Sequence, residues 1–259
     1  MKKTIYYSDE FNDDFANTDI DQKKLPPDYP YFPKSPVRRV LAFILYYIIA
    51  VPLVFLMQKV VYHEKIVGRK KLKPYRKTGY FLYGNHTRTA GDAYSPALIT
   101  FPKKAYIITS ADSVSIRGIK RIVEDLGAIP IPNSLAGMKN FRNAIKEHSE
   151  RNHVISVYPE AHIWPYFTDI RPFTDVSFRY PAETKKPVFC FTVTYRKQRL
   201  LNFPKTTVYI DGPFFPNADK TPKQNQAFLR NECYNTMKRR AENSTYQHVE
   251  YIKKNGKDK

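Results

Sequence analysis

The chain has 259 residues, and 43 Lys and Arg against 24 Asp and Glu give it a formal net charge of +19. This charge indicates an anionic partner, either a phospholipid bilayer or nucleic acid, and the length suits one domain. Two cysteines, Cys190 and Cys233, are too few for a disulfide framework or a Cys-rich zinc site, and they fit a reducing compartment.

Residues 1–35 form a polar segment with seven acidic and five basic residues and four prolines between Pro26 and Pro33. Such a composition predicts a solvated arm that either lies against the body or is disordered. It is not a secretory signal, which would begin with a short basic region and reach its apolar core sooner. The rest of the chain therefore carries about +21.

Residues 40–57 are eighteen residues without a charge, and a helix of that length reaches roughly 27 Å, which is marginal for the hydrocarbon core. Pro52 is expected to break or kink this helix. Basic residues flank both ends, so no charge asymmetry orients a span. We therefore expect either a membrane-spanning helix or a kinked element in one leaflet, with a buried core helix of a soluble protein as the alternative. The following basic segment suits an anionic lipid surface.

Beyond residue 64, short apolar runs rich in β-formers alternate with helical periods. Helices are expected over residues 115–126, after Ser134, and from Thr221-Pro222 onward. Strands are expected over residues 79–84, 105–109, 128–131, 153–158, 187–195 and 206–210. The alternation predicts an α/β fold with mostly parallel strands, whose functional residues follow the carboxyl ends of the strands.

His86 and Asp92 follow the first of these strands in the run Gly84-Asn85-His86-Thr87-Arg88-Thr89-Ala90-Gly91-Asp92. A histidine titrates near neutrality, and a carboxylate on its second ring nitrogen fixes the tautomer for a general base. The spacing alone is a weak signal, because a capping histidine with Asp92 as a helix N-cap fits it too.

Glu160 follows another apolar strand in the run Tyr158-Pro159-Glu160-Ala161-His162. The proline ends sheet pairing and lets Glu160 project from the sheet edge. Taken alone, it is more simply a surface glutamate beside an ordinary strand end. Lys185-Lys186-Pro187-Val188 marks only the start of a strand, and Cys190 suits a small buried apolar residue.

In this order the motifs resemble those of the glycerolipid acyltransferase family of lysophosphatidate and glycerol-3-phosphate acyltransferases. That family has an Asn-His, four residues, Asp motif; a Gly-x-x-x-Ile-Asp-Arg motif; a Phe-Pro-Glu-Gly-Thr-Arg motif; and a Pro-Val strand. The corresponding segments here are Asn85-His86 with Asp92, residues 127–133, residues 158–162, and Pro187-Val188. The resemblance covers residues 40 to 215.

The resemblance implies a mixed sheet flanked by helices, with an N-terminal membrane-embedded helical element. It implies that His86 deprotonates an acceptor hydroxyl, that Asp92 orients the imidazole, and that the hydroxyl attacks the thioester of acyl-CoA or acyl-carrier protein. No cofactor or metal is implied. The acceptor would be a lysophospholipid such as 1-acylglycerol-3-phosphate, with Glu160 holding it. The substrate-binding residues expected around the matched motifs are Asn85, Arg88, Glu160, Ala161, His162 and Arg171.

This sequence departs from the family pattern in two ways. Five residues, not four, separate His86 from Asp92, and the extra residue is expected to loop out at Gly91, where φ is free. The arginines of the second and third motifs are missing, and a buried phosphate needs charge-assisted partners. Arg171 is the first candidate to replace them, then Arg88 or Arg179; otherwise the acceptor carries no phosphate.

The predicted organisation is a polar arm (1–35), a membrane-associating element (36–62) and an acyltransferase α/β domain with a basic tail (63–259). The expected location is the cytoplasmic face of a membrane. A non-catalytic protein of the lipid surface is a competing interpretation. A nucleic-acid binder is disfavoured, because no recognised motif appears and the bases crowd beside the apolar segment.

Overall fold

The computed structural model describes residues 3–16, 23–89, 91–199 and 201–254. Its main sheet has seven strands in the order β2-β8-β7-β3-β6-β4-β5, and neighbouring strands are parallel except for β7 and β8. The strands are β2 (Lys65–Val67), β3 (Tyr80–Gly84), β4 (Ala105–Thr109), β5 (Ala128–Pro130), β6 (Val154–Val157), β7 (Val188–Arg196) and β8 (Lys205–Phe214). The expected α/β class with a mixed, mostly parallel sheet is confirmed.

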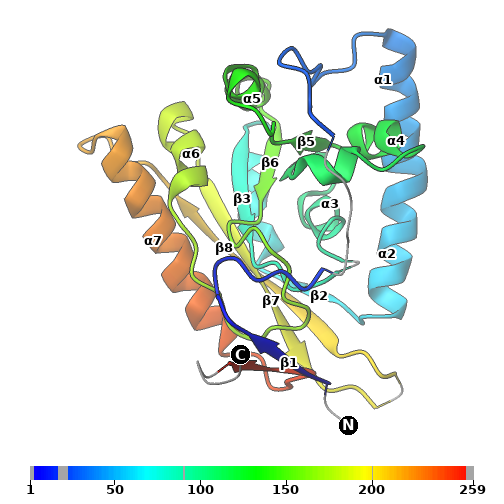
Figure 1. Ribbon diagram of the computed structural model, residues 1–259, viewed down its shortest axis with the longest axis vertical. Coiled ribbons are helices and arrows are strands. Elements are labelled where there is room, and N and C mark those ends of the chain that lie inside the picture. Colours follow the sequence, from blue (N-terminus) through cyan, green and yellow to red (C-terminus); the bar gives the residue numbers. More distant parts are fainter. Residues whose placement is uncertain (1–2, 17–22, 90, 200, 255–259) are drawn as a thin grey trace.

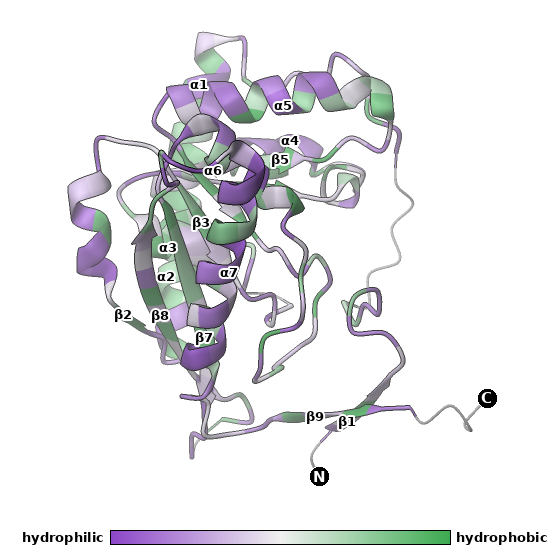
Figure 2. Ribbon diagram, turned by 90° about the vertical axis from the view of Figure 1, so that its left-hand side faces the viewer, coloured by the Kyte–Doolittle hydropathy of each residue, from purple (hydrophilic) through white to green (hydrophobic). Residues whose placement is uncertain are grey.

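Helices cover both faces of this sheet (Figure 1). One core cluster joins the sheet to α5 (Leu135–Glu150), α6 (Arg179–Thr184) and α7 (Pro222–Ala241). The opposite cluster joins it to α3 (Ser95–Thr100) and the 3-10 helix η2 (Arg69–Tyr75). Figure 2 shows the apolar strands of the sheet behind the hydrophilic outer face of α7. The remaining short helices are η3 (Ala111–Val114), α4 (Lys120–Asp125) and η4 (Val176–Phe178).

The helix expected over residues 115–126 is shorter than predicted, since α4 begins only at Lys120. Gly118 has φ +88°, a left-handed conformation that interrupts any helix running through it. The other predicted elements lie within a few residues of their expected positions. Thr221 opens α7 with a capping box, in which its side chain accepts from the Gln224 N–H.

The apolar segment forms one continuous helix over Pro36–Val60, built from α1 (Pro36–Phe43), the π-helical η1 (Ile44–Ala50) and α2 (Val51–Val60). The expected break at Pro52 does not occur. The π-helical turn precedes the proline, and the N–H of Val51 donates to Tyr46 five residues back, so the chain continues past the missing donor of Pro52. Twenty-five residues make a helix about 37 Å long.

Only one face of this helix is buried. Val51 and Val54 pack against Leu98 of α3. On the same face, the hydroxyl oxygen of Tyr46 accepts the N–H of Ala105, the first residue of β4, at 3.1 Å. Of an 18-residue apolar stretch in this helix, only 22% is buried against the rest of the protein. The exposed apolar residues of the helix are Val37, Val40, Leu41, Phe43, Ile44, Ile48, Ile49, Leu53, Phe55, Leu56 and Val60.

The described parts of the arm lie against the body, which is one of the two expected alternatives. β1 (Lys3–Tyr7) pairs in parallel with β9 (Val249–Lys253), so the two ends of the chain form a separate two-stranded sheet, seen beside the termini in Figure 2. Leu25 and Tyr29 are buried against η3. The segment 17–22 and the tail 255–259 lie outside the described residues.

Candidate active site

His86 lies two residues beyond the carboxyl end of β3, and its Nδ1 is 2.9 Å from Oδ2 of Asp92. The carboxylate can only accept, so Nδ1 carries the proton and Nε2 has a free lone pair. The His86 side chain is 17% exposed and that of Asp92 is 1% exposed. The expected pairing is present, and its geometry is that of a general base with an orienting carboxylate.

The Asp92 carboxylate is fixed by hydrogen bonds from the backbone N–H groups of its own loop. Its Oδ2 also accepts the N–H groups of Thr87 at 2.7 Å and Arg88 at 2.8 Å. The Tyr158 hydroxyl donates to the backbone carbonyl of Asp92 at 2.5 Å. These bonds fix the carboxylate relative to His86 despite the longer loop between them, because several donors converge on one side chain.

Gly91 lies in this loop against the side chain of Arg88. A Cβ at this position would lie 2.9 Å from Nε of Arg88, too close for a carbon atom, so the glycine makes room for the Arg88 side chain.

An aromatic stack supports the imidazole from the next strand. The rings of His86 and Tyr158 are 4.5 Å apart at an interplanar angle of 21°. Phe191 of β7 supports Tyr158 edge-on at 5.8 Å. At the end of β3, Gly84 allows this approach, because a Cβ there would lie 2.1 Å from the Phe191 ring. The ring plane of His86 is therefore set by residues of three adjacent strands.

Glu160 was expected to project from the sheet edge and hold an acceptor. It is instead buried, with 4% of its surface exposed. Its Oε2 accepts the N–H of His86 at 2.9 Å and its Oε1 accepts the N–H of Arg171 at 3.1 Å. Burial raises the pKa of Glu160, and Arg171 opposes this shift. Glu160 therefore connects the His86 segment to the loop that follows β6.

Arg171, the expected phosphate clamp, is 1% exposed. Its guanidinium donates to backbone carbonyls of Glu160, His162 and Glu10, and lies 5.0 Å from the Trp164 ring. Burial lowers the pKa of Arg171, although Glu160 acts in the opposite direction. The structure thus uses Arg171 to hold the loop together, which leaves the guanidinium covered by this chain's own acceptors.

Arg88 is also buried and engaged. It donates to Glu64 at 2.7 Å, to Gln58 at 3.0 Å, and through Nε to Asp92 at 3.3 Å, and it contacts Ser95. Burial works against its charge, but Glu64 and Asp92 outweigh burial and raise the pKa of Arg88. Neither Arg88 nor Arg171 is therefore arranged as a phosphate ligand. Arg179, the third candidate, pairs with Glu183 at 2.9 Å on the surface of α6.

Of the other expected substrate-binding residues, one is buried and holds the fold together, and two are accessible to solvent. Asn85 is buried, and its amide exchanges two hydrogen bonds with the backbone of Val193 in β7, at 2.8 and 3.1 Å. Ala161 is exposed with φ +62°. His162 is half-exposed, with Nδ1 3.5 Å from a carboxylate oxygen of Asp14. Of this group, only Ala161 and His162 lie where a solvent-borne molecule can touch them.

The N-terminal arm packs on the loop that covers the site. Trp164 donates its backbone N–H to the His86 carbonyl at 3.2 Å and its indole N–H to the Asp13 carbonyl at 2.8 Å. Tyr7 of β1 and Tyr251 of β9 lie 4.7 and 4.8 Å from the Trp164 ring. Both chain ends therefore contact Trp164, whose backbone is hydrogen-bonded to His86.

Sequence reasoning did not identify Glu64, Tyr158, Trp164 or the arm as parts of this site. A signal existed for Glu64, which is the only acid between Gln58 and Thr78 in a strongly basic segment. Such an isolated acid favours a specific partner. In the residues that the structure describes, no group of three or more His, Cys, Asp or Glu side chains is arranged to hold a metal ion.

No protein-family model matches this sequence, and no curated protein matches it. Among solved structures, the fold is similar to the crystal structure of the 1-acyl-sn-glycerophosphate (LPA) acyltransferase PlsC from Thermotoga maritima, with a TM-score of 0.52 and 13% sequence identity. The similarity covers 81% of this chain and 99% of that one. At this identity the comparison establishes a shared fold.

Proposed function

We propose that this protein is an O-acyltransferase of membrane lipids. It transfers a fatty acyl group from acyl-CoA or acyl-carrier protein to a hydroxyl of a lysophospholipid such as 1-acylglycerol-3-phosphate. The observation that carries the proposal is the His86–Asp92 pair, with 2.9 Å between Nδ1 and Oδ2, at the carboxyl edge of a sheet. The likeness of the fold to an LPA acyltransferase supports it.

In the proposed reaction, Nε2 of His86 takes the proton of the acceptor hydroxyl while the hydroxyl oxygen attacks the thioester carbonyl. The tetrahedral intermediate collapses by breaking the carbon–sulfur bond. The imidazolium returns the proton to the leaving thiolate, so the products are an ester and a free thiol. Asp92 keeps the proton on Nδ1 throughout, and Tyr158 holds the plane of the ring.

We also propose that the helix over residues 36–60 attaches the protein to a membrane, where lipid acceptors reside. A helix about 37 Å long with one apolar face exposed suits either a span or an embedded element in one leaflet. The cytoplasmic face is the proposed side, because the free thiols of Cys190 and Cys233 fit a reducing compartment.

A second candidate is acyl transfer to an acceptor without a phosphate. The observation that favours it is the burial of Arg88 and Arg171, the first two candidates to replace the missing arginines, under the chain's own carboxylates and carbonyls. A phosphate held at this edge would need other partners.

The test is an acyl-transfer assay on the purified protein in lipid vesicles. Acyl-CoA and acyl-carrier protein serve as donors, and lysophosphatidate, lysophosphatidylcholine and monoacylglycerol serve as acceptors, with products identified by mass spectrometry. Ester formation that depends on His86 supports the proposal, and the preferred acceptor separates the two candidates. A folded, vesicle-bound protein that acylates none of them would contradict acyl transfer and favour a non-catalytic protein of the lipid surface.

A further inference from the structure

A cavity of about 170 Å³ lies near the amino-terminal end of β3, whereas His86 follows the carboxyl end of the same strand. Tyr80, the first residue of β3, lines this cavity. Tyr80 and His86 are six steps apart along a nearly extended chain, which corresponds to roughly 20 Å. No group in this cavity therefore takes part in the proposed chemistry at His86.

Five cations line this cavity, and we call it the basic pocket: Arg69, Lys70, Lys73, Arg76 and Lys103. The floor is buried and is formed by Leu72, Tyr80, Ile99 and Thr100. None of its ten lining residues is acidic, and in the described part of the chain none of the five cations forms an ion pair within 4.0 Å. Like charges gathered around one cavity repel each other unless an anion occupies it.

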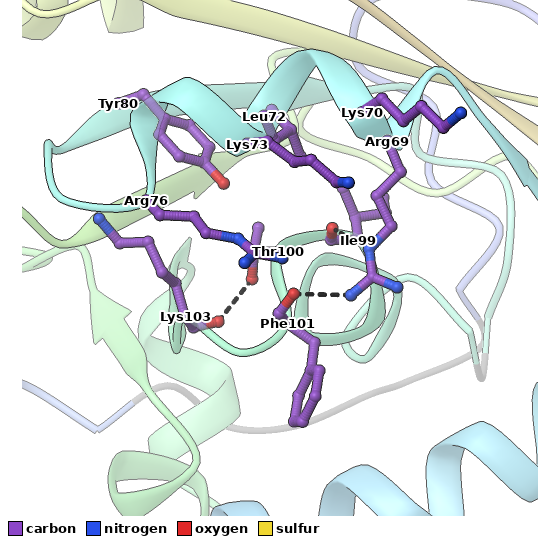
Figure 3. A pocket seen from close by; sticks show the side chains of 10 residues that line it. All are labelled: Arg69, Lys70, Leu72, Lys73, Arg76, Tyr80, Ile99, Thr100, Phe101 and Lys103. Carbon is purple, nitrogen blue, oxygen red and sulfur yellow. Dashed lines mark hydrogen bonds between the residues drawn. The ribbon is translucent and has the colours of Figure 1, made fainter.

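The neighbouring Lys71 shows that this arrangement is specific to the pocket. Lys71 lies on the same short helix, η2, but its Nζ is 2.7 Å from Asp211. The cation that faces the sheet is therefore neutralised, whereas those that line the pocket are not. Figure 3 shows the ends of Arg69, Lys73 and Arg76 and the hydroxyl of Tyr80 directed into one space above Phe101.

Two of the five cations are fixed in place by backbone carbonyls. Arg69 donates to Ile99 at 3.2 Å and to Phe101 at 2.6 Å. Lys103 donates to Thr78 at 2.5 Å and to Asn152 at 2.7 Å. A frame of fixed cations around a buried floor is preorganised for an anion, because little side-chain freedom is lost on binding. A volume of about 170 Å³ admits a phosphate group with the atoms bonded to it.

The surroundings of the pocket indicate where the phosphate comes from. Phe101, at its rim, is 44% exposed, and the adjacent Pro102 carbonyl accepts the Tyr47 hydroxyl of the apolar helix at 3.0 Å. In Figure 3 this helix, in the blue of the N-terminal part, crosses the lower right of the view, below the pocket. The pocket therefore lies next to the helix that we propose contacts the bilayer. We infer that the basic pocket binds the phosphate of an anionic phospholipid headgroup and so fixes the protein at a defined position on the membrane.

This inference rests on the proposed membrane attachment but not on acyl transfer, so its test contains no acyl donor. Binding of the full chain to vesicles is compared between the wild type, the pocket variant Lys73→Gln/Arg76→Gln, and the control variant Lys65→Gln/Lys77→Gln. The control pair is exposed and lies in the same basic segment, but it does not line the pocket. Both variants lose the same charge, so diffuse attraction to the surface weakens both alike.

We expect the pocket variant to lose at least tenfold more affinity for phosphatidate vesicles than the control variant, since charge-assisted hydrogen bonds to the phosphate are lost as well. We also expect the wild type to prefer phosphatidate over phosphatidylserine at matched surface potential, and the pocket variant to lose this preference. Equal losses in the two variants would overturn the inference. Inorganic phosphate added without vesicles is the remaining arm, and saturation of the pocket by it at micromolar concentration would assign the pocket to a soluble ligand instead.

Discussion

Arg88 and Glu64 form an ion pair of 2.7 Å between Nη1 and Oε2, and neither residue is more than 3% exposed. Arg88 lies two residues after His86, and Glu64 lies just beyond the apolar helix. Because Arg88 also donates to Gln58 of that helix and to Asp92, one guanidinium connects the apolar helix to the carboxylate that orients His86.

Glu64→Gln is expected to lower the free energy of unfolding by about 3 to 5 kcal/mol, because it leaves the buried charge of Arg88 without its main partner. Urea unfolding followed by circular dichroism measures this. The matched control is Asp175→Asn, which breaks the exposed pair of Asp175 with Lys223 and should cost less than about 1 kcal/mol. The double variant Arg88→Met/Glu64→Leu should recover most of the stability that Glu64→Gln loses, because no buried charge is left unpaired. Its acyl-transfer activity should nevertheless be low, because Asp92 loses the hydrogen bond from Arg88. Equal stability of Glu64→Gln and Asp175→Asn would show that the pair is not structurally important.

His86→Ala is expected to reduce acyl transfer at least about 100-fold, since general-base catalysis contributes about that much or more. The free energy of unfolding should fall by about 1 to 3 kcal/mol, because the ring stacks on Tyr158 and bonds to the buried carboxylate of Asp92, so circular dichroism must show that the variant is still folded. His162→Ala, at a half-exposed histidine in the neighbouring loop, is the comparison and should lose much less activity than His86→Ala, because it supplies no base. Retention of more than about a tenth of the wild-type rate in His86→Ala would rule out this base.

Arg171→Gln distinguishes a structural arginine from a phosphate clamp. The buried guanidinium holds backbone carbonyls, so we expect kcat to fall by a similar factor for lysophosphatidate and monoacylglycerol, together with a loss of about 2 to 4 kcal/mol in stability. Steady-state kinetics with both acceptors check this, with Arg179→Gln on the surface of α6 as the control. A large rise in KM for the phosphorylated acceptor alone would instead restore Arg171 as a phosphate ligand.

Trp164 is the single tryptophan of the chain, and its emission reports how the arm packs on the site. Tyr7→Ala removes a ring 4.7 Å away, so we expect emission to shift toward that of the urea-unfolded chain and activity to fall. Tyr6→Ala is the control, because Tyr6 is the neighbouring residue of β1 and is 57% exposed. Identical spectra for the two variants would mean that β1 does not cover Trp164 in solution.

Acid should destabilise the fold through His148 and His153, whose Nδ1 atoms are 2.9 Å apart. Burial lowers the pKa of His148 to about 3 and that of His153 to about 4. The unfolded chain takes up protons below about pH 6.5 whereas the folded one does not, so stability is full above that pH and is lost as pH falls toward 4. We expect a loss of about 2 to 4 kcal/mol between pH 7 and pH 4.5. Urea unfolding at several pH values measures it, and His148→Gln/His153→Gln should flatten the curve; parallel curves would assign the pH dependence to other groups.

Six of the seven strands of the main sheet were predictable from the sequence, because each is a local run of apolar residues bounded by turn formers, as in β4 and β7. The edge strand β2 was not predicted, because its three residues begin with Lys65 and are too short to show a period. The His86–Asp92 pair was predictable for a similarly local reason. Both residues belong to one short loop at the carboxyl end of β3, so their proximity is set within seven residues of chain.

The partners of Glu160, Arg88 and Arg171 were not predictable, because each of them lies far away in the sequence. A charged residue near a motif suggests a ligand, yet Arg88 meets Glu64 from the end of the apolar helix and Arg171 meets the carbonyl of Glu10 from the arm. Buried charges and backbone carbonyls need partners wherever the fold brings them together, and the packing of distant segments decides which partner each one finds. The sequence by itself therefore determined six strands of the sheet and the residues of the His86 loop. Only the tertiary structure decided that the nearby arginines are held within the fold, since burial and pairing depend on which segments pack against one another.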